Sequence, residues 1–326
     1  MSLSKIILYK QNQVKNYKII MSGLNIYYHP LYTDGIDSKS RFPRERYKLI
    51  YELLQESDYK EIINFISSPI CKKEDLLLAH DNIYVEKFLT NNLNSREKRK
   101  IGLQPWNEHI IERTLRIMGG SVSAIDSALK YSISANMAGG THHAFHSYGA
   151  GYCIFNDLAV SAYVANRDFN IKNILIIDLD VHQGDGTASI LREDKNIFTF
   201  SMHCEKNYPL NKEKSDLDIT LEKDIGDDIY LKLLENNLKK LENFNSEVIF
   251  FQAGVDTLRS DNLGYLSLTH KGLTIRNRMI LNFAKNRNNP IVVFMGGGYS
   301  KPINETVIAF KDLFIQCALY AEENSK

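Results

Sequence analysis

Four short apolar runs limit the folds open to this chain more than any other feature of its sequence. The runs are NILII (173–177), IFTFS (197–201), EVIFFQ (247–252) and PIVVFM (290–295). Nearly continuous apolar runs of this length, separated by helical stretches, are typical of a parallel sheet covered on both faces. The sequence therefore predicts an α/β fold with a central, mostly parallel sheet flanked by helices.

The rest of the chain predicts one continuous domain, because it contains no internal repeat, low-complexity tract or linker. We expect a catalytic domain over residues 24–326, preceded by a polar, lysine-rich lead-in segment over residues 1–23. Apolar periodicity predicts further elements. These are a strand over 24–28, helices over 44–55 and 82–89, and one or two helices over 107–129 around Gly119 and Gly120.

Charge and cysteine usage exclude some classes of protein. The chain has 40 basic and 39 acidic residues, a net charge of +1, which gives no general attraction to nucleic acid or anionic membranes. Its four cysteines are scattered without a CxxC pair, so neither a disulfide framework nor a thiolate zinc site is expected. No apolar run approaches the ~20 residues that span a membrane. We expect a cytoplasmic or otherwise intracellular protein without membrane or nucleic-acid partners.

The segment that follows the NILII run combines carboxylates and an imidazole. Side chains alternate along an extended backbone, so Asp178, Asp180 and His182 are expected on one side. Such a cluster at the end of a buried strand is costly unless a cation compensates it. Asp180 and His182 suit a divalent metal, and Asp256, just after the EVIFFQ run, is the candidate third ligand. Three protein ligands leave a position open, as hydrolytic zinc requires.

Simpler interpretations exist for both parts of this predicted metal site. An isolated DxDxH is more often a surface turn with an Asx cap. Asp256 taken alone would be a helix N-cap, since Thr257 and Leu258 could begin a helix.

Two further features are typical of catalysis. His142 and His143 lie in a glycine-framed loop, and histidine is the usual general acid or base. Asp178 and Asp185 are the carboxylates available to orient them. Tyr299 follows three glycines and could donate its hydroxyl to a substrate carbonyl as half of an oxyanion site. The alternatives are a loop of solvated histidines and an ordinary aromatic residue after a turn.

Together these motifs resemble the histone deacetylase superfamily, whose arginase/deacetylase fold is a three-layer sandwich. The sequences of the THHAF and HCEKNYP segments most resemble those of the bacterial deacetylase-like and class IV branches. The resemblance is carried by IYYHP (26–30), RFPRERY (41–47), GGTHHAFHSYGAGYCIFNDLAVSA (139–162), DLDVHQGDGT (178–187), FSMHCEKNYP (200–209), GVDTLRSD (254–261) and GGGY (296–299).

The resemblance implies roles for the catalytic residues. It implies that His143 is the general base that later acts as acid, and that His142 is its electrostatic partner. Asp178 and Asp185 would stand behind His142 and His143 respectively, and Tyr299 would polarise the carbonyl. The implied zinc ligands are Asp180, His182 and Asp256.

The resemblance also implies a substrate tunnel and a second ion. Gly151 and Tyr152 would form one wall of an acyl-lysine tunnel and Tyr208 the other, where many relatives have phenylalanine in place of the two tyrosines. Backbone carbonyls near Asp178, Asp180, His182 and Ser201 would bind a structural potassium ion.

The function implied is a zinc-dependent amidohydrolase that removes acyl groups from lysine side chains of proteins or peptides, with histone tails as one candidate. An amidohydrolase of acetylpolyamines or other small acylated amines is the nearest alternative, and the short stretch 91–106 argues mildly against it. A catalytically dead binding module would lack one of these motifs. An arginase-like ureohydrolase would need a second metal site with more carboxylates and histidines.

Overall fold

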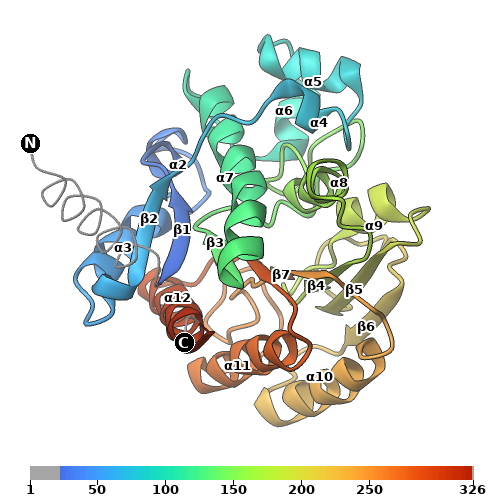
Figure 1. Cartoon of the computed structure of the whole chain (residues 1–326). Coiled ribbons are helices and arrows are strands. Elements are labelled where there is room, and N and C mark those ends of the chain that lie inside the picture. Colours follow the sequence, from blue (N-terminus) through green and yellow to red (C-terminus); the bar gives the residue numbers. More distant parts are fainter. Residues whose placement is uncertain (1–22, 325–326) are drawn as a thin grey trace, which may run out of the picture.

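Each of the four apolar runs becomes a strand of one parallel sheet (Figure 1). They form β4 (Ile174–Asp178), β5 (Ile197–Cys204), β7 (Val248–Gln252) and β8 (Ile291–Phe294). All residues of β4, β7 and β8 are buried, which is why these runs lack the polar alternation of a half-exposed strand. The predicted strand over 24–28 is confirmed as β1 (Leu24–Tyr28).

The computed structural model describes residues 23–324, and these place eight parallel strands in the order β2-β1-β3-β8-β7-β4-β5-β6. The sequence patterns did not predict β2 (Ile63–Ser67), β3 (Ile133–Asn136) or β6 (Leu217–Leu221). The strands β2 and β6 lie at the two edges of the sheet and are partly exposed, and β3 has only four residues, two of them polar.

Helices cover both faces of the sheet and complete three layers. On one face lie α7 (Ile110–Tyr131), α8 (Asp157–Phe169) and α9 (Asp185–Leu191). On the other lie α3 (Glu45–Gln55), α10 (Asp227–Leu241), α11 (His270–Asn286) and α12 (Asn304–Asn324). The remaining short helices are α2 (Leu31–Asp34), α4 (Lys73–Leu76), α5 (Asn82–Leu89) and α6 (Ser95–Ile101), with a 3₁₀ turn at Lys60–Ile62.

This architecture confirms the predicted fold class, a single α/β domain whose sheet, predicted to be mostly parallel, is parallel throughout the described part of the chain. The lead-in segment predicted over 1–23 lies outside the described residues apart from Gly23, so it stays a prediction. No helix between residues 23 and 324 combines the length and apolar character that crossing a bilayer requires.

The region predicted as one or two helices is a single helix, α7, which contains Gly119 and Gly120 in its middle. The glycines do not break the helix. They are required because neighbouring atoms leave no room for a side chain at either position. A Cβ at Gly119 would overlap the Pro69 carbonyl oxygen, and one at Gly120 would crowd the hydroxyls of Ser68 and Tyr32. The two glycines therefore let α7 pass close to the chain that follows β2.

We expect Gly119→Ala to destabilise the protein, although alanine is the better helix former by about 1 kcal/mol. The added methyl group would overlap a backbone carbonyl, and overpacking of this kind costs about 1–3 kcal/mol. Urea unfolding measures the change, and Ser123→Ala, on the same helix, is the control that should stay near wild type. An increase in the free energy of unfolding of Gly119→Ala would contradict this account of α7.

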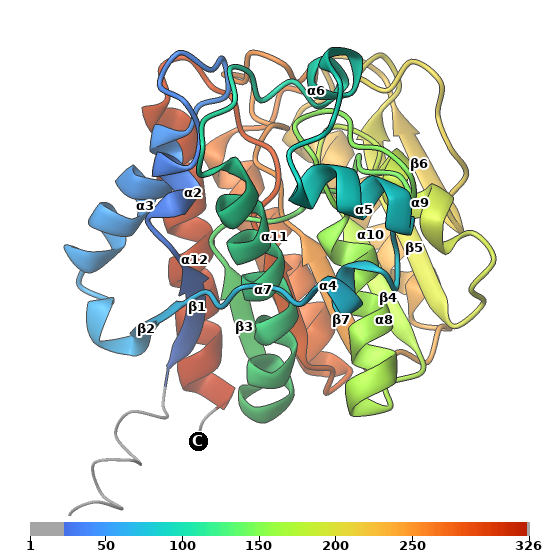
Figure 2. The ribbon, with the colours of Figure 1, turned by 90° about the horizontal axis from the view of Figure 1, so that it is seen from above.

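The loops that follow the strands gather along one edge of the sheet, where α6 also lies (Figure 2). In a parallel sheet the carboxyl ends of all strands meet at one edge, and ligands of open α/β sheets bind there. The polar motifs of the sequence therefore come together at this edge.

Candidate metal centre and active site

Four neighbouring strands supply the polar groups of the site. The strands β3, β8, β7 and β4 are adjacent in the sheet, although they are distant in sequence. The histidine pair follows β3, the glycines and Tyr299 follow β8, Asp256 follows β7, and the DLDVH segment follows β4. The order of the strands in the sheet therefore brings four segments that are distant in sequence together in one site.

The three residues predicted as metal ligands form one buried cluster. Asp180, His182 and Asp256 each offer a ligand atom, and these atoms all lie within 4.8 Å of one another. The Nδ1 atom of His182 is 3.0 Å from Oδ1 of Asp180 and 3.2 Å from Oδ2 of Asp256. Two carboxylates and one imidazole are a donor set that suits zinc and related divalent metals. These residues therefore fit the metal site predicted from the sequence.

Backbone groups orient both carboxylates of this cluster. The amide of Gly297 donates a hydrogen bond to Oδ2 of Asp180 (2.8 Å), and the amide of Val181 donates to Oδ1 of Asp256 (2.9 Å). A Cβ at Gly297 would overlap Oδ2 of Asp256 and crowd Asp180, so only glycine allows this close approach.

The electrostatics of the cluster favour a cation. Burial disfavours the charged ring of His182, but the hydrogen bonds and charges of Asp180 and Asp256 outweigh burial and raise its pKa to about 10. Burial, followed by the charge of Asp180, raises the pKa of Asp256 to about 7. His182 and Asp256 thus hold their protons more tightly than usual, whereas at Asp180 burial is outweighed by the charge of His142 and the contacts with His182, which keep the pKa of Asp180 well below its usual range. A divalent cation that bound here would displace the protons of His182 and Asp256.

The geometry rules out the simpler interpretations of this segment. Asp180 and His182 are buried, so the segment is no surface turn, although Asx bonds join Asp178 to the amide of Asp180 and Asp180 to the amide of His182. No helix begins at Asp256. The predicted alternation fails in one respect, because β4 ends at Asp178 and residues 180–182 bend.

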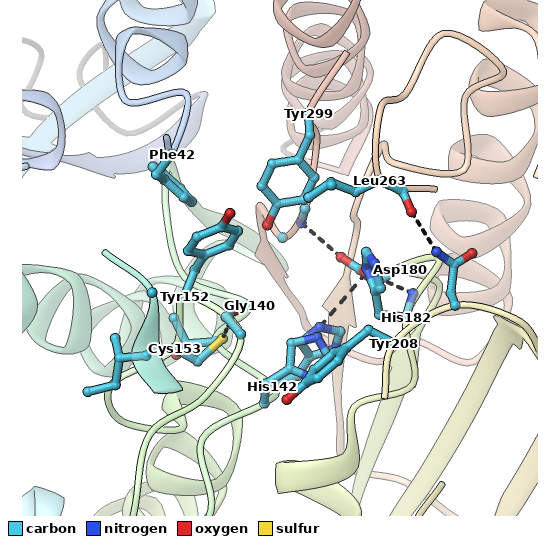
Figure 3. A pocket seen from close by; sticks show the side chains of 18 of the residues that line it. Phe42, Gly140, His142, Tyr152, Cys153, Asp180, His182, Tyr208, Leu263 and Tyr299 are labelled. Carbon is cyan, nitrogen blue, oxygen red and sulfur yellow. Dashed lines mark hydrogen bonds and ion pairs between the residues drawn. The ribbon is translucent and has the colours of Figure 1, made fainter. Parts of the chain in front are cut away.

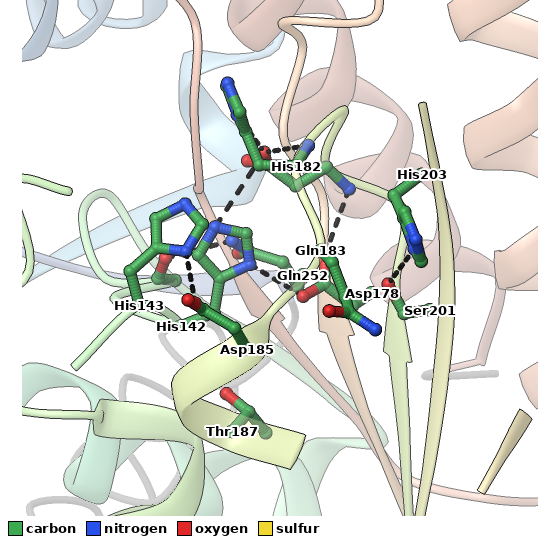
Figure 4. Close-up of polar contacts among 12 residues, drawn as sticks. His142, His143, Asp178, His182, Gln183, Asp185, Thr187, Ser201, His203 and Gln252 are labelled. Carbon is green, nitrogen blue, oxygen red and sulfur yellow. Dashed lines mark hydrogen bonds and ion pairs between the residues drawn. The ribbon is translucent and has the colours of Figure 1, made fainter. Parts of the chain in front are cut away.

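His142 and His143 are buried side by side, and each contacts a carboxylate (Figure 4). The Nδ1 atom of His142 lies 2.7 Å from Oδ2 of Asp178, and that of His143 lies 2.6 Å from Oδ1 of Asp185. The Nε2 atom of His142 is also 3.8 Å from Oδ1 of Asp180. A loop of solvated histidines is therefore excluded, and Nδ1 of each ring is committed to a carboxylate.

The two histidines have opposite protonation preferences. Burial opposes the charge of His142, but Asp178 and Asp180 outweigh burial and raise its pKa to about 9. Burial, followed by the neighbouring charge of His142, lowers the pKa of His143 to about 4 despite its bond to Asp185. The pair therefore combines one cationic ring with one neutral ring that can accept a proton.

Tyr299 stands at the same pocket and is held through its backbone. Its amide donates to Oδ2 of Asp261 (2.6 Å), while its ring packs near Phe42 and Tyr152. Burial raises the pKa of Tyr299 well above its usual range, so the phenol stays protonated and can donate. No described residue forms a hydrogen bond with its hydroxyl.

A cavity of about 830 Å³ connects these groups with the solvent. Figure 3 shows Phe42 and Tyr152 on one side and Tyr208 beside the histidines on the other. Gly151 and Tyr152 have left-handed backbone angles (φ 52° and 68°), and a Cβ at Gly151 would crowd the ring of His143. The ring of Tyr208 contacts that of His143 edge-on, with 4.8 Å between their centroids. The three predicted wall residues therefore line one pocket with the histidines.

Two residues that support the site, Arg276 and Asp157, were not predicted from the sequence, although Asp157 lies within the 139–162 segment that carries the resemblance. Arg276 is fully buried and donates to the carbonyls of Leu179, Ala253 and Gly254, which precede the metal-site residues after β4 and β7. Asp157 accepts hydrogen bonds from the amides of Gly140 and Thr141 and so holds the histidine loop. Arg276 reaches these loops from α11, far along the chain, whereas Asp157 is the first residue of α8, 16 residues after Thr141.

Comparisons with known proteins agree with this geometry. The model of the histone deacetylase domain matches residues 40–310. An uncharacterized protein of Picosynechococcus sp. is 40% identical, and the match covers 87% of this chain and 95% of that protein.

Two relatives with functional names are more distant. Histone deacetylase 2 of Arabidopsis thaliana is 26% identical, with 82% of this chain and 71% of the relative covered. The acetoin utilization protein AcuC of Staphylococcus aureus is also 26% identical, with 79% and 72% covered. The match to the family model covers most of the chain, and the matched range contains the DLDVH, THH and GGGY segments. This chain therefore belongs to the histone deacetylase family.

Proposed function

We propose that this chain is a zinc-dependent hydrolase that removes acyl groups from lysine side chains of proteins or peptides. The observation that carries the proposal is one pocket that reaches Asp180 and His182 of the buried Asp-His-Asp cluster, two histidines bound to carboxylates, and a tyrosine whose hydroxyl has no partner among the described residues. Family membership, the donor set and the pocket support it.

Asp180, His182 and Asp256 would hold the metal. A zinc ion bound there would act as a Lewis acid on the substrate carbonyl and would lower the pKa of water. The chain's own residues would move the protons. His143, neutral and fixed through Nδ1 by Asp185, accepts a proton from the attacking water at Nε2 and later delivers it to the leaving amine.

The remaining groups would stabilise the charge that develops during the reaction. The Tyr299 hydroxyl donates a hydrogen bond to the oxyanion, and His142, held cationic by Asp178, adds positive charge beside His143. Gly151, Tyr152 and Tyr208 line the path of the acyl-lysine chain. The potassium site predicted near the carbonyls of Asp178, Asp180, His182 and Ser201 stays a prediction.

A panel of lysine peptides that carry acyl groups from acetyl to myristoyl tests this proposal, with acetylpolyamines assayed in parallel. We expect peptide turnover that a chelator abolishes and added zinc restores, because the cluster supplies three ligands and leaves an open position. Turnover that survives complete metal removal would refute the metal assignment. Turnover of acetylpolyamines without any turnover of peptides would favour the small-amine alternative.

A further inference from the structure

The mouth of the pocket carries three exposed cationic side chains. Arg41, Lys100 and Lys206 all line the pocket and come from three separate segments of the chain. None of them forms an ion pair with a carboxylate in the part of the chain between residues 23 and 324. The ammonium of Lys100 instead lies 3.3 Å from the centroid of the Tyr148 ring. The positive charges of the mouth therefore remain available to a ligand.

Among residues 23–324, no carboxylate forms an ion pair with these cations, although the buried Asp185 lies near enough to Lys100 to favour its charged form. Among the described residues that line the pocket, the only acidic one is Asp180, which belongs to the metal cluster. Glu205 is exposed next to Lys206 in sequence, but it does not line the pocket. The residues outside the described range, 1–22 and 325–326, include no aspartate or glutamate. The side chains along the entrance thus present positive charge to an approaching substrate.

The same mouth is also apolar. Tyr208, Leu210, Leu263 and Tyr265 line it with exposed fractions of 43%, 91%, 38% and 44%. Large apolar side chains gathered around a pocket mark a surface that contacts a ligand. Figure 3 shows Tyr208 and Leu263 beside the metal cluster, so a group held against them would be close to the scissile amide.

We propose that this mouth selects acylated lysines flanked by acidic and apolar residues, and disfavours polycationic substrates such as basic peptide tails and acetylpolyamines. The inference rests on the proposed deacylase function. An anionic flank is attracted by Arg41, Lys100 and Lys206, whereas a cationic flank meets like charges and no carboxylate. Exposed charges are screened by salt, so the preference must weaken as the ionic strength rises.

Three peptides of equal length test the inference on the zinc-loaded enzyme. They share a central acyl-lysine and an apolar neighbour and differ only in two flanking positions, which are glutamate, glutamine or lysine. We expect kcat/KM to fall in that order, with a ratio of about tenfold between the acidic and basic peptides, carried mainly by KM. Raising the salt from about 0.05 M to about 0.5 M should shrink this ratio.

A charge reversal at the mouth provides the matched variant. Lys206→Glu should lose most of the preference for the acidic peptide, measured within the variant as the ratio of kcat/KM between the glutamate and glutamine peptides. Lys195→Glu is the control, because Lys195 is exposed just before β5, at the opposite end of the strands, and should keep the full preference.

The outcomes separate this inference from the proposed function. Equal turnover of the three peptides, or a preference for the lysine-flanked one, overturns the selectivity while leaving a working deacylase. A preference for acidic flanks that does not respond to salt or to Lys206→Glu also overturns it. Absence of turnover with all three peptides contradicts the deacylase proposal itself.

Discussion

Asp180→Asn is expected to abolish zinc binding and to lower kcat/KM by about 10³-fold or more, since the Lewis-acid contribution that would be lost is several kcal/mol. Oδ1 of Asp180 faces His182, and its Oδ2 accepts the Gly297 amide. An asparagine amide removes the negative charge and directs a donor group into the cluster, so the remaining His182 and Asp256 hold a metal poorly. Metal analysis of gel-filtered protein measures the zinc content directly.

A second measurement separates metal loss from unfolding. Zinc that binds only the folded state should raise the Tm of wild type, and this shift should vanish in Asp180→Asn while circular dichroism stays unchanged. Asp75→Asn is the matched control. Asp75 is also buried, but it lies on α4 and forms an ion pair with Arg167 of α8, away from the site. One zinc per chain in Asp180→Asn would break the ligand assignment.

The sequence predicted best those elements whose signal is local. The strands β4, β7 and β8 are continuous apolar runs because both of their faces are covered, and the bounds were predicted to within one residue at each end. The helix α5 was predicted over its full length, Asn82–Leu89. The strand β5 extends through His203 and Cys204, beyond the predicted end, because pairing with β6 continues there.

Elements whose conformation depends on distant contacts were missed or left open. The strand β6 lies at the edge of the sheet, so its residues are only partly buried and show no clear apolar pattern. The glycine pair in α7 left open whether this region forms one helix or two, because the contact that explains Gly119 is made with Pro69, which is distant in sequence.

The metal-binding and catalytic members of the site were predicted from residue type and from their positions after the strands, whereas the wall residues Gly151, Tyr152 and Tyr208 were implied only by the resemblance to the family. The buried Arg276 lies on α11, where nothing local marks it, and Asp157 lies in the 139–162 segment that carries the resemblance, but only the folded structure shows that its carboxylate holds the histidine loop.

Tyr299→Phe is expected to lower kcat/KM by about 10²–10³-fold, the usual cost of losing one oxyanion donor. The fold should be unaffected, because the contacts of Tyr299 involve its amide and its ring. Asp261 binds the amide, and Phe42 and Tyr152 pack against the ring, all of which phenylalanine retains. Turnover of an acyl-lysine peptide measures the loss.

The hydroxyl of Tyr299 bonds no residue in the range 23–324, so its removal should leave both Tm and zinc content at wild-type values. Since burial raises the pKa of this phenol, wild type should keep the donor throughout the neutral and mildly alkaline range, and the ratio between wild type and variant should not change with pH there. Tyr163→Phe on α8 is the control for a lost phenol outside the site. Near wild-type turnover in Tyr299→Phe would remove this residue from the mechanism, whereas a lowered zinc content would show that it acts through the metal site instead.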